Sequence, residues 1–311
     1  MKKYIKIMRI DHWIKQMFIL PGCFFAYFFM KESFVVDIHL VIRLITGFLG
    51  TCFITSANYV INEWLDAKFD RFHPTKKNRS VVTNDMSVKV VIAMYIVLTM
   101  CGFVLGYFTS FPFLCMVIWL WMMGILYNVQ PMRTKDIPIL DVLSESVNNA
   151  IRLLMGWFLI SSDTIPPCSI VLGYCMGGAF LMATKRYAEY RMINNPEVAG
   201  KYRKSFQFYS EKSLLLSSFF YAMTSVFFTG VFLIKYRIEL VLLIPALIGL
   251  FCLYFWISFK EDSAVQKPEK LYREKGLMLY VLLFIVLFIV LMTVNIPQLD
   301  NLMSNELIRI R

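Results

Sequence analysis

The strongest constraint on this chain is a succession of apolar stretches that are long enough to cross a lipid bilayer. A membrane-spanning helix needs about 20 mainly apolar residues, and about nine segments fit that template. Lipid offers no partner to an unpaired backbone group, so such segments must be helical. We therefore predict an all-α polytopic membrane protein in which residues 1–311 form a single domain. The predicted spans are 13–30, 38–62, 88–107, 111–127, 139–160, 170–185, 214–234, 240–259 and 276–294.

Composition and charge agree with a membrane protein. The chain is 58% hydrophobic and only 17% charged, which excludes an ordinary soluble domain. Its net charge of +11 does not indicate a nucleic-acid partner, because 25 of its 32 lysines and arginines fall on one side of the predicted spans. That bias predicts a cytoplasmic N-terminus and an external C-terminus, and we expect the bacterial inner membrane.

The start of the chain and its cysteines add two expectations. Lys15 interrupts the first apolar run and no small-residue cleavage site follows it, so we expect a retained span rather than a signal peptide. The 7 cysteines form no CxxC pair. Neither a zinc site nor a disulfide framework is therefore predicted.

The stretch NYVINEWLDAKFDRFHPTKKNR, at the end of the second predicted span, carries the densest polar pattern. Asn58, Asn62, Asp66 and Asp70 recur every four residues and would form one stripe on a helix, with Glu63 on its edge. Oxygen ligands at this spacing suit a hard cation such as Mg2+, and the basic residues that follow suit phosphates. The alternative is a solvated helix end whose acids pair with nearby lysines and arginines. Carboxylates that emerge from a membrane span are usually functional, which favours the metal site.

A second constellation, ATKRYAEYR, ends the sixth predicted span. Lys185 and Glu189 share one helical face, as do Arg186 and Tyr190. Basic residues are favoured at a cytoplasmic helix end by the helix dipole and by topology. The alternative to ligand binding is therefore that these basic residues only anchor the helix end at the membrane surface.

Two further basic residues lie within predicted spans. An arginine inside a membrane normally faces a partner or a polar cavity, and Arg152 follows Glu145 by about two turns. A structural ion pair between these two residues is the alternative to a binding role. Lys15 is the other candidate for contact with an anion.

NEWLDAKFD resembles the first aspartate-rich motif, N-D-x-x-D-x-x-x-D, of the UbiA-type membrane prenyltransferase superfamily. Asn62, Asp66 and Asp70 match, and Glu63 replaces one aspartate. The resemblance covers essentially the whole chain. It implies a bundle of about nine helices around a central cavity open to the cytoplasmic side, with Asn62, Asp66 and Asp70 as the ligands of Mg2+.

The second motif departs from the common pattern of that superfamily, D-x-x-Y-A-x-x-D. Aligned on Tyr187, its two aspartate positions fall on Thr184 and Arg191. The loss of two carboxylates and the gain of Lys185, Arg186 and Arg191 favour direct phosphate binding over metal binding. The pattern K-R-x-x-E instead resembles the branch of decaprenyl-phosphate phosphoribosyltransferases.

Two spacings are also similar to that branch. One relates Asp141 to Arg152 and the other relates Arg203 to Tyr209. Gln16 stands where that group commonly has asparagine.

The resemblance implies that phosphoribose passes from phosphoribosyl diphosphate to a polyprenyl phosphate, with release of diphosphate and with Mg2+ as cofactor. One rival is a prenyltransferase that moves a polyprenyl group from its diphosphate to an aromatic or other small acceptor. Another is a transporter with an acidic ion site, but few polar residues lie near mid-span. The resemblance implies catalytic roles for Asp66, Asp70 and Lys185, donor contacts for Arg79, Lys185, Arg186 and Glu189, and acceptor contacts for Lys15 and Arg152.

Overall fold

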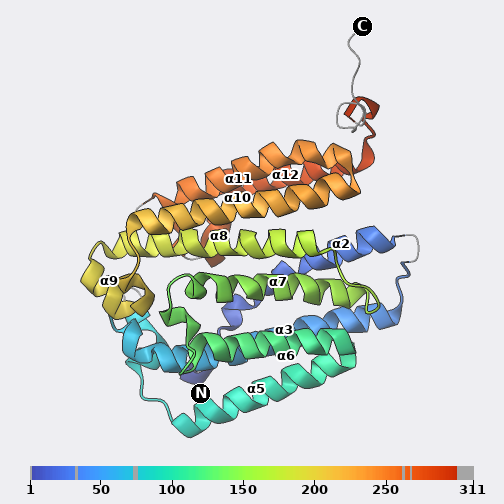
Figure 1. Ribbon diagram of the computed structural model, residues 1–311. Coiled ribbons are helices and arrows are strands. Elements are labelled where there is room, and N and C mark those ends of the chain that lie inside the picture. The colour runs from blue at the N-terminus through green and yellow to red at the C-terminus, as the bar shows by residue number, and fades with distance from the viewer. Residues whose placement is uncertain (1, 32–33, 73–75, 261–262, 267, 300–311) are drawn as a thin grey trace.

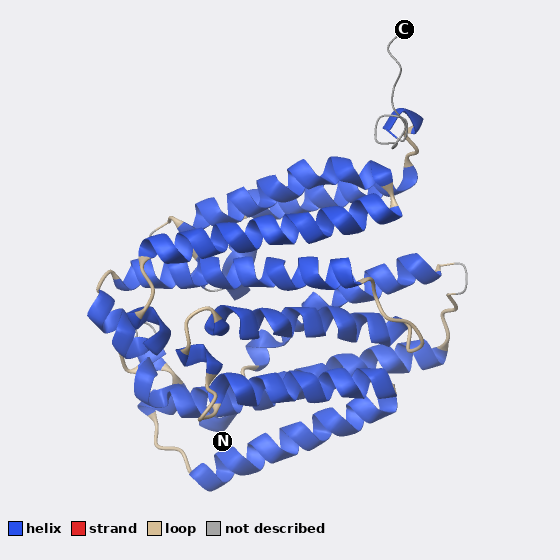
Figure 2. Cartoon of the chain, viewed as in Figure 1, coloured by secondary structure: helices blue, strands red, loops and turns tan. Residues whose placement is uncertain are grey.

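The structure is a computed structural model that describes residues 2–31, 34–72, 76–260, 263–266 and 268–299. Within these ranges every regular element is helical (Figure 2). The α-helices are α1 Lys2–Ile7, α2 Leu20–Met30, α3 Ile38–Asp70, α4 Ser80–Thr83, α5 Val88–Thr109, α6 Phe111–Asn128, α7 Leu140–Ile160, α8 Cys168–Ile193, α9 Pro196–Tyr202, α10 Glu211–Tyr236, α11 Leu243–Ser258 and α12 Lys275–Thr293. The 3-10 helices are η1 Ile10–Ile19, η2 Lys76–Asn78, η3 Thr134–Asp136, η4 Lys204–Gln207, η5 Ile238–Leu242, η6 Ala264–Gln266 and η7 Pro268–Arg273.

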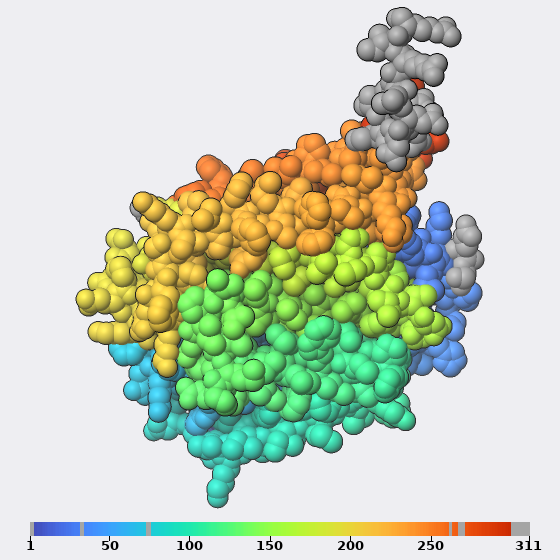
Figure 3. All heavy atoms as spheres, in the orientation of Figure 1, coloured from blue at the N-terminus to red at the C-terminus, as the bar shows by residue number. Residues whose placement is uncertain are grey.

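The long helices run side by side in one bundle (Figure 1). Helix α7 lies in its middle, packed against α2, α6 and α8, while α3 packs against α5 and α6. Helix α8 packs along α10, and α11 pairs with α12. Figure 3 shows these groups in contact along one face, in the order of the chain from α5 to α10. The short elements η3, α9 and η4 gather at one end of the bundle, where the polar motifs lie.

The predicted spans are all helical in the structure. Eight helical segments of the described chain are long and apolar enough to cross a membrane. The ninth prediction, at 139–160, corresponds to the 21-residue helix α7. Helix α7 is less apolar because it carries Asp141, Glu145 and Arg152, which is consistent with its place inside the bundle.

Two boundaries differ from the sequence prediction in a way that matters for the site. Helix α3 does not end at residue 62 but continues to Asp70, and α8 does not end at residue 185 but continues to Ile193. Both polar motifs therefore lie on helices. Buried polar contacts hold these extra turns, so apolarity alone could not predict where the helices end.

Helices α2 and α7 approach each other closely through a pair of glycines. A Cβ at Gly22 would lie 1.9 Å from the backbone oxygen of Leu153, and one at Gly156 would lie 2.0 Å from that of Ile19. Small residues at such crossings let two backbones come into contact. This contact fixes α7, which carries part of the polar site, against the N-terminal segment.

We expect Gly156→Ala to lower the thermal denaturation temperature of the purified protein in detergent. The added methyl group has no space at the α2–α7 crossing, and overpacking of this kind costs about 1–3 kcal/mol. Gly276→Ala is the matched control, because nothing lies within 4 Å of a Cβ at that position. Equal denaturation temperatures for the two variants would contradict the close approach.

Candidate functional site

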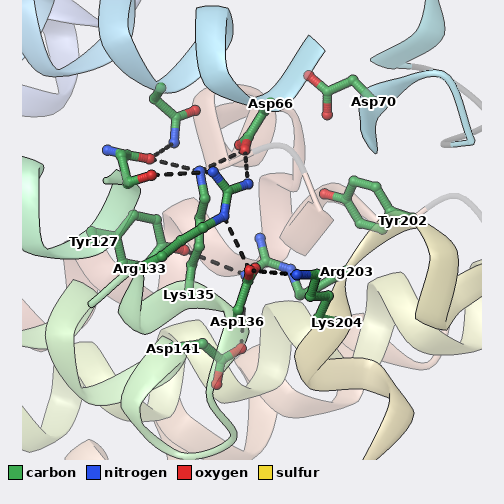
Figure 4. Close-up of polar contacts among 12 residues, drawn as sticks. Asp66, Asp70, Tyr127, Arg133, Lys135, Asp136, Asp141, Tyr202, Arg203 and Lys204 are labelled. Carbon is green, nitrogen blue, oxygen red and sulfur yellow. Dashed lines mark hydrogen bonds and ion pairs between the residues drawn. The ribbon is translucent and has the colours of Figure 1, made fainter. Parts of the chain in front are cut away.

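The last turns of α3 present Asp66 to a loop from another part of the chain. Asp66 Oδ1 accepts hydrogen bonds from Arg133 Nη2 at 2.8 Å and from Lys135 Nζ at 2.6 Å. Figure 4 shows both basic side chains converging on this carboxylate. Asn62 donates to the side chain of Asn128, while Asn58 turns to the backbone of α6, where it donates to Leu120 O. The predicted stripe from Asn58 to Asp70 thus lies on one helix, and its first two members contact α6.

Asp70 lies one turn further along α3 and has its own basic partner. Arg79 Nη1 donates to Asp70 Oδ2 at 2.7 Å. Arg79 Nε also lies 3.7 Å from Glu63 Oε1, and Arg9 Nη1 donates to the same oxygen at 3.0 Å. The pairing of acids with nearby basic residues, the alternative noted from the sequence, is therefore present. The intervening residues His73, Pro74 and Thr75 lie outside the described part of the chain.

The cations that hold Asp66 were missed by sequence reasoning. Arg133 and Lys135 follow α6, and their side chains are buried, at 7% and 3% exposed. In the sequence, two basic residues in a short loop between spans indicate only that the loop is cytoplasmic. Burial lowers the pKa of the Lys135 ammonium to about 8, although Asp66 opposes this shift. Asp136 continues the network, 3.1 Å from Arg133 Nε and 3.7 Å from Lys204 Nζ. The 133–136 segment thereby joins α3 to η4.

A second cluster surrounds Glu189 on α8. Its Oε2 accepts a hydrogen bond from Arg186 Nη1 at 3.1 Å, and its Oε1 accepts one from Lys76 Nζ at 3.0 Å. Lys76 also contacts Tyr202 at the end of α9. Lys185, one residue before Arg186, is half-buried and makes no hydrogen bond or ion pair with any described residue. Of the predicted donor contacts, Lys185 alone therefore has no such partner within the described chain.

Asp141, at the start of α7, is fully buried and holds η4 in place. It accepts hydrogen bonds from Ser205 Oγ at 3.1 Å and from Tyr209 Oη at 2.8 Å. Arg186 Nε and Arg203 Nη1 lie 3.5 and 3.7 Å from its Oδ2. Three residues singled out by spacing, Asp141, Arg203 and Tyr209, thus meet in space.

Tyr127 connects the two clusters, and no sequence pattern pointed to it. Its hydroxyl accepts hydrogen bonds from Arg186 Nη2 at 3.2 Å and from Arg203 Nη1 at 3.4 Å. The Lys135 ammonium lies 5.7 Å from the centre of its ring. A single tyrosine near the end of an apolar span is typical of the membrane interface, so only the fold reveals this contact.

The predicted acceptor residues lie at a different contact, between η1 and α7. Arg152 Nε donates to Gln16 Oε1 at 3.0 Å, and Arg152 Nη1 donates to Asn148 O at 3.2 Å. The neighbouring Lys15 contacts His12. The ion pair of Arg152 with Glu145, the alternative noted above, is not formed: within the described chain, no Lys or Arg pairs with Glu145. The guanidinium is instead satisfied by neutral oxygens.

The oxygen atoms around Asp66 suit Mg2+ better than a soft metal. Among the described residues no group of three or more His, Cys, Asp or Glu could hold a metal. Mg2+ does not need such a group, since it typically takes one or two carboxylates together with substrate phosphates. Asp66 uses only Oδ1 and Asp70 only Oδ2 in their described contacts. The other oxygen of each remains available, so the residues fit the ion.

Comparison with known proteins places these motifs in a family. Residues 19–283 match the model of the UbiA prenyltransferase family. The solved structure of a UbiA homologue from Archaeoglobus fulgidus bound to GPP and Mg2+ superposes with a TM-score of 0.68, at 18% identity, over 94% of this chain and 100% of that one. At this identity the match shows the fold.

Two curated relatives differ in the activity that their names describe. The decaprenyl-phosphate phosphoribosyltransferase of Corynebacterium glutamicum is 24% identical over 211 residues, which cover 66% of this chain and 59% of the relative. The protoheme IX farnesyltransferase 2 of Lysinibacillus sphaericus is 25% identical over 231 residues, covering 70% of each chain. The match thus spans less than two thirds of the first relative.

We expect Asp141→Asn to destabilise the protein strongly. The change removes the charge that compensates Arg186 and Arg203, and breaking a buried ionic contact typically costs about 3–5 kcal/mol. Chemical denaturation in mixed micelles measures the loss. Asp163→Asn is the control, because Asp163 lies in an exposed loop and, within the described chain, its side chain accepts a hydrogen bond from Ser162 alone. A free energy of unfolding equal to that of the control would exclude Asp141 as the anchor of η4.

Proposed function

We propose that this chain, which belongs to the UbiA prenyltransferase family, transfers phosphoribose from phosphoribosyl diphosphate to a polyprenyl phosphate and releases diphosphate. The relative from Corynebacterium glutamicum, named for this type of activity, supports the proposal. The cationic character of the second cluster supports it further.

The observation that carries the proposal is the basic character of the end of α8 and of the residues that pack around it from η2 and from the end of α9. Arg186 and Arg203 gather there with Lys76, against the carboxylates of Glu189 and Asp141, and Lys185 precedes Arg186 on the same helix. The proposed donor carries a diphosphate on C1 and a phosphate on C5. Such a soluble and highly charged molecule needs more direct cationic contacts than a prenyl diphosphate, whose tail is held by apolar contacts.

Each motif receives a role in this reaction. Asn62, Asp66 and Asp70 would hold Mg2+, which when bound offsets the negative charge that develops on the leaving diphosphate. Arg79, Lys185 and Arg186 would bind the donor phosphates, with Glu189 orienting Arg186. An oxygen of the acceptor phosphate forms the new bond to C1 as the bond from C1 to the diphosphate breaks. That phosphate is already ionised at neutral pH, so no protein nucleophile is required.

The acceptor phosphate is assigned to Lys15 and Arg152. Arg152 reaches Gln16 across the η1–α7 contact, which places its guanidinium beside the segment that carries Lys15. Positive charge within a span suits an anionic group that reaches a polar cavity inside the bundle. We place this end of the bundle, with the N-terminus, on the cytoplasmic side of the bacterial inner membrane, as the distribution of basic residues favours.

A second candidate function is prenyl transfer from a prenyl diphosphate to an aromatic or other small acceptor. The relative named as a farnesyltransferase and the homologue bound to GPP favour it. The second motif argues against it. Thr184 is fully buried and carries no charge, while Arg191 pairs with Glu211 at 3.3 Å and lies against Tyr187 and Phe259. Neither residue can replace a metal-binding aspartate.

One assay separates the two functions. Purified protein in detergent is supplied with Mg2+ and either labelled phosphoribosyl diphosphate plus a polyprenyl phosphate, or a prenyl diphosphate plus an aromatic acid. The proposal expects a lipid-soluble labelled product from the first pair. If product forms only from the second pair of substrates, the proposal is wrong and the activity is prenyl transfer.

We expect Asp66→Asn and Asp70→Asn each to lower the rate about a hundredfold or more, because each removes one charge from the metal site at nearly constant size. The rate of product formation at saturating Mg2+ measures the effect. Asp163→Asn, far from both clusters in sequence, serves as the control and should retain full activity. Near-wild-type rates in both variants would remove these residues from the catalytic site.

Lys185→Ala should raise the Michaelis constant for the donor, because a charge-assisted contact of about 1.5–3 kcal/mol is lost. The constant for the lipid should change much less. Arg186→Lys separates a forked contact from simple charge, since lysine retains only the latter. Lys212→Ala removes a charge from an exposed site and is the control. A selective effect on the lipid substrate would overturn the donor role of α8.

A further inference from the structure

One face of α7 carries a row of polar side chains, of which only Arg152 has so far been given a role. Glu145, Asn148, Asn149 and Arg152 are spaced by three, one and three residues, which places them on the same side of the helix. Helix α7 packs against α2, α6 and α8, yet all four residues are only half-buried. This polar face of α7 therefore keeps accessible surface within the bundle.

The polar face of α7 connects the two groups of residues assigned to the substrates. Asp141, four residues before Glu145, contacts Arg186 and Arg203 at the basic end of α8. Arg152, assigned to the acceptor phosphate, follows Glu145 by seven residues. At about 1.5 Å per residue these separations are about 6 and 10 Å along the helix axis. The part of the donor that lies between its phosphates and the acceptor is therefore expected beside Glu145.

This face presents hydrogen-bond acceptors that have no donor within the described chain. Glu145 makes no hydrogen bond or ion pair with any described residue, and Asn148 Oδ1 is buried without a partner there. Gln16, which is fully buried, accepts from Arg152 through Oε1, while its Nε2 donates to no described residue. Buried polar atoms in proteins are almost always paired. Two acceptors and one amide donor are thus ready for a ligand.

These groups suit a hydroxyl better than a phosphate or an isoprenoid chain. A hydroxyl can donate its hydrogen to Glu145 or Asn148 and accept one from Gln16. A fully ionised phosphate has no hydrogen to donate and is repelled by the carboxylate of Glu145. An isoprenoid chain offers neither donor nor acceptor, and its binding here would leave the polar groups unpaired.

We propose that Glu145, together with Asn148, binds the hydroxyl groups of the sugar in the donor and so selects a phosphorylated pentose over a prenyl group. The proposal rests on the proposed function in one respect: the donor named there carries such hydroxyls on C2 and C3. Glu145 takes no part in bond formation. It determines specificity, while the basic residues at the end of α8 hold the donor phosphates.

Binding without turnover tests the subsite. The full-length protein in detergent, without acceptor and with a chelator that removes any metal contribution of Glu145, is titrated calorimetrically with ribose 5-phosphate and with 2-deoxyribose 5-phosphate. The two sugars differ by one hydroxyl. We expect the wild type to bind ribose 5-phosphate about tenfold more tightly, since the deoxy sugar lacks a charge-assisted hydrogen bond. In Glu145→Leu, which removes the acceptor at similar size, the two sugars should bind equally.

Two further variants make the comparison specific. Glu197→Leu is the matched control, because it makes the same substitution at an exposed position of α9, and it should keep the preference of the wild type. Glu145→Gln retains one carbonyl oxygen without the charge. It should keep part of the preference, which tests the subsite even if Glu145→Leu fails to fold.

Three outcomes would overturn the subsite. They are a wild type that does not prefer ribose 5-phosphate, a preference that is unchanged in both Glu145 variants, and an equal loss of preference in Glu197→Leu. A preference that depends on Glu145 supports the subsite even if no phosphoribosyl lipid forms, in which case only the proposed function fails. Conversely, phosphoribosyl transfer with a donor Michaelis constant unchanged in Glu145→Leu would overturn only the subsite.

Discussion

The polar end of this bundle depends on the compensation of buried carboxylates. Asp66, Asp141 and Glu189 would each be very costly to bury without a partner, and each is met by arginine or lysine from a different segment. The ion pairs therefore do more than neutralise charge, because they attach the short elements to the long helices. Apolar packing builds the bundle, and these contacts shape its functional end.

The same compensation links the proposed ligands to the fold. A phosphate that binds here competes with the carboxylates for the arginines and lysines, and a divalent cation competes with those basic groups for the carboxylates. When donor and metal bind together, the donor phosphates pair with the arginines and lysines, and the metal pairs with the carboxylates. Either ligand alone leaves some buried charge without its partner, so the site favours joint occupancy.

Much of the fold was predictable, because apolar length and four-residue spacing are local properties of a sequence. The spans and the stripe from Asn58 to Asp70 follow from them. The partners of the stripe were not predictable: Arg133 and Lys135 are ordinary loop residues until the fold brings them to Asp66. Likewise, sequence distance suggested Glu145 for Arg152, whereas helix packing brought Gln16 to it. The catalytic and binding roles remain predictions.

The length of α3 has a consequence for the substrates. Its 33 residues form a single uninterrupted helix, which at about 1.5 Å per residue extends roughly 50 Å, whereas the hydrocarbon layer is about 30 Å thick. The helix therefore holds its carboxylate end at a fixed height above the lipid chains. A lipid phosphate of any tail length presents its headgroup near that same level. With the proposed lipid phosphate as acceptor, a helix of this length would favour headgroups at one depth and would tolerate variation in the number of isoprene units behind them.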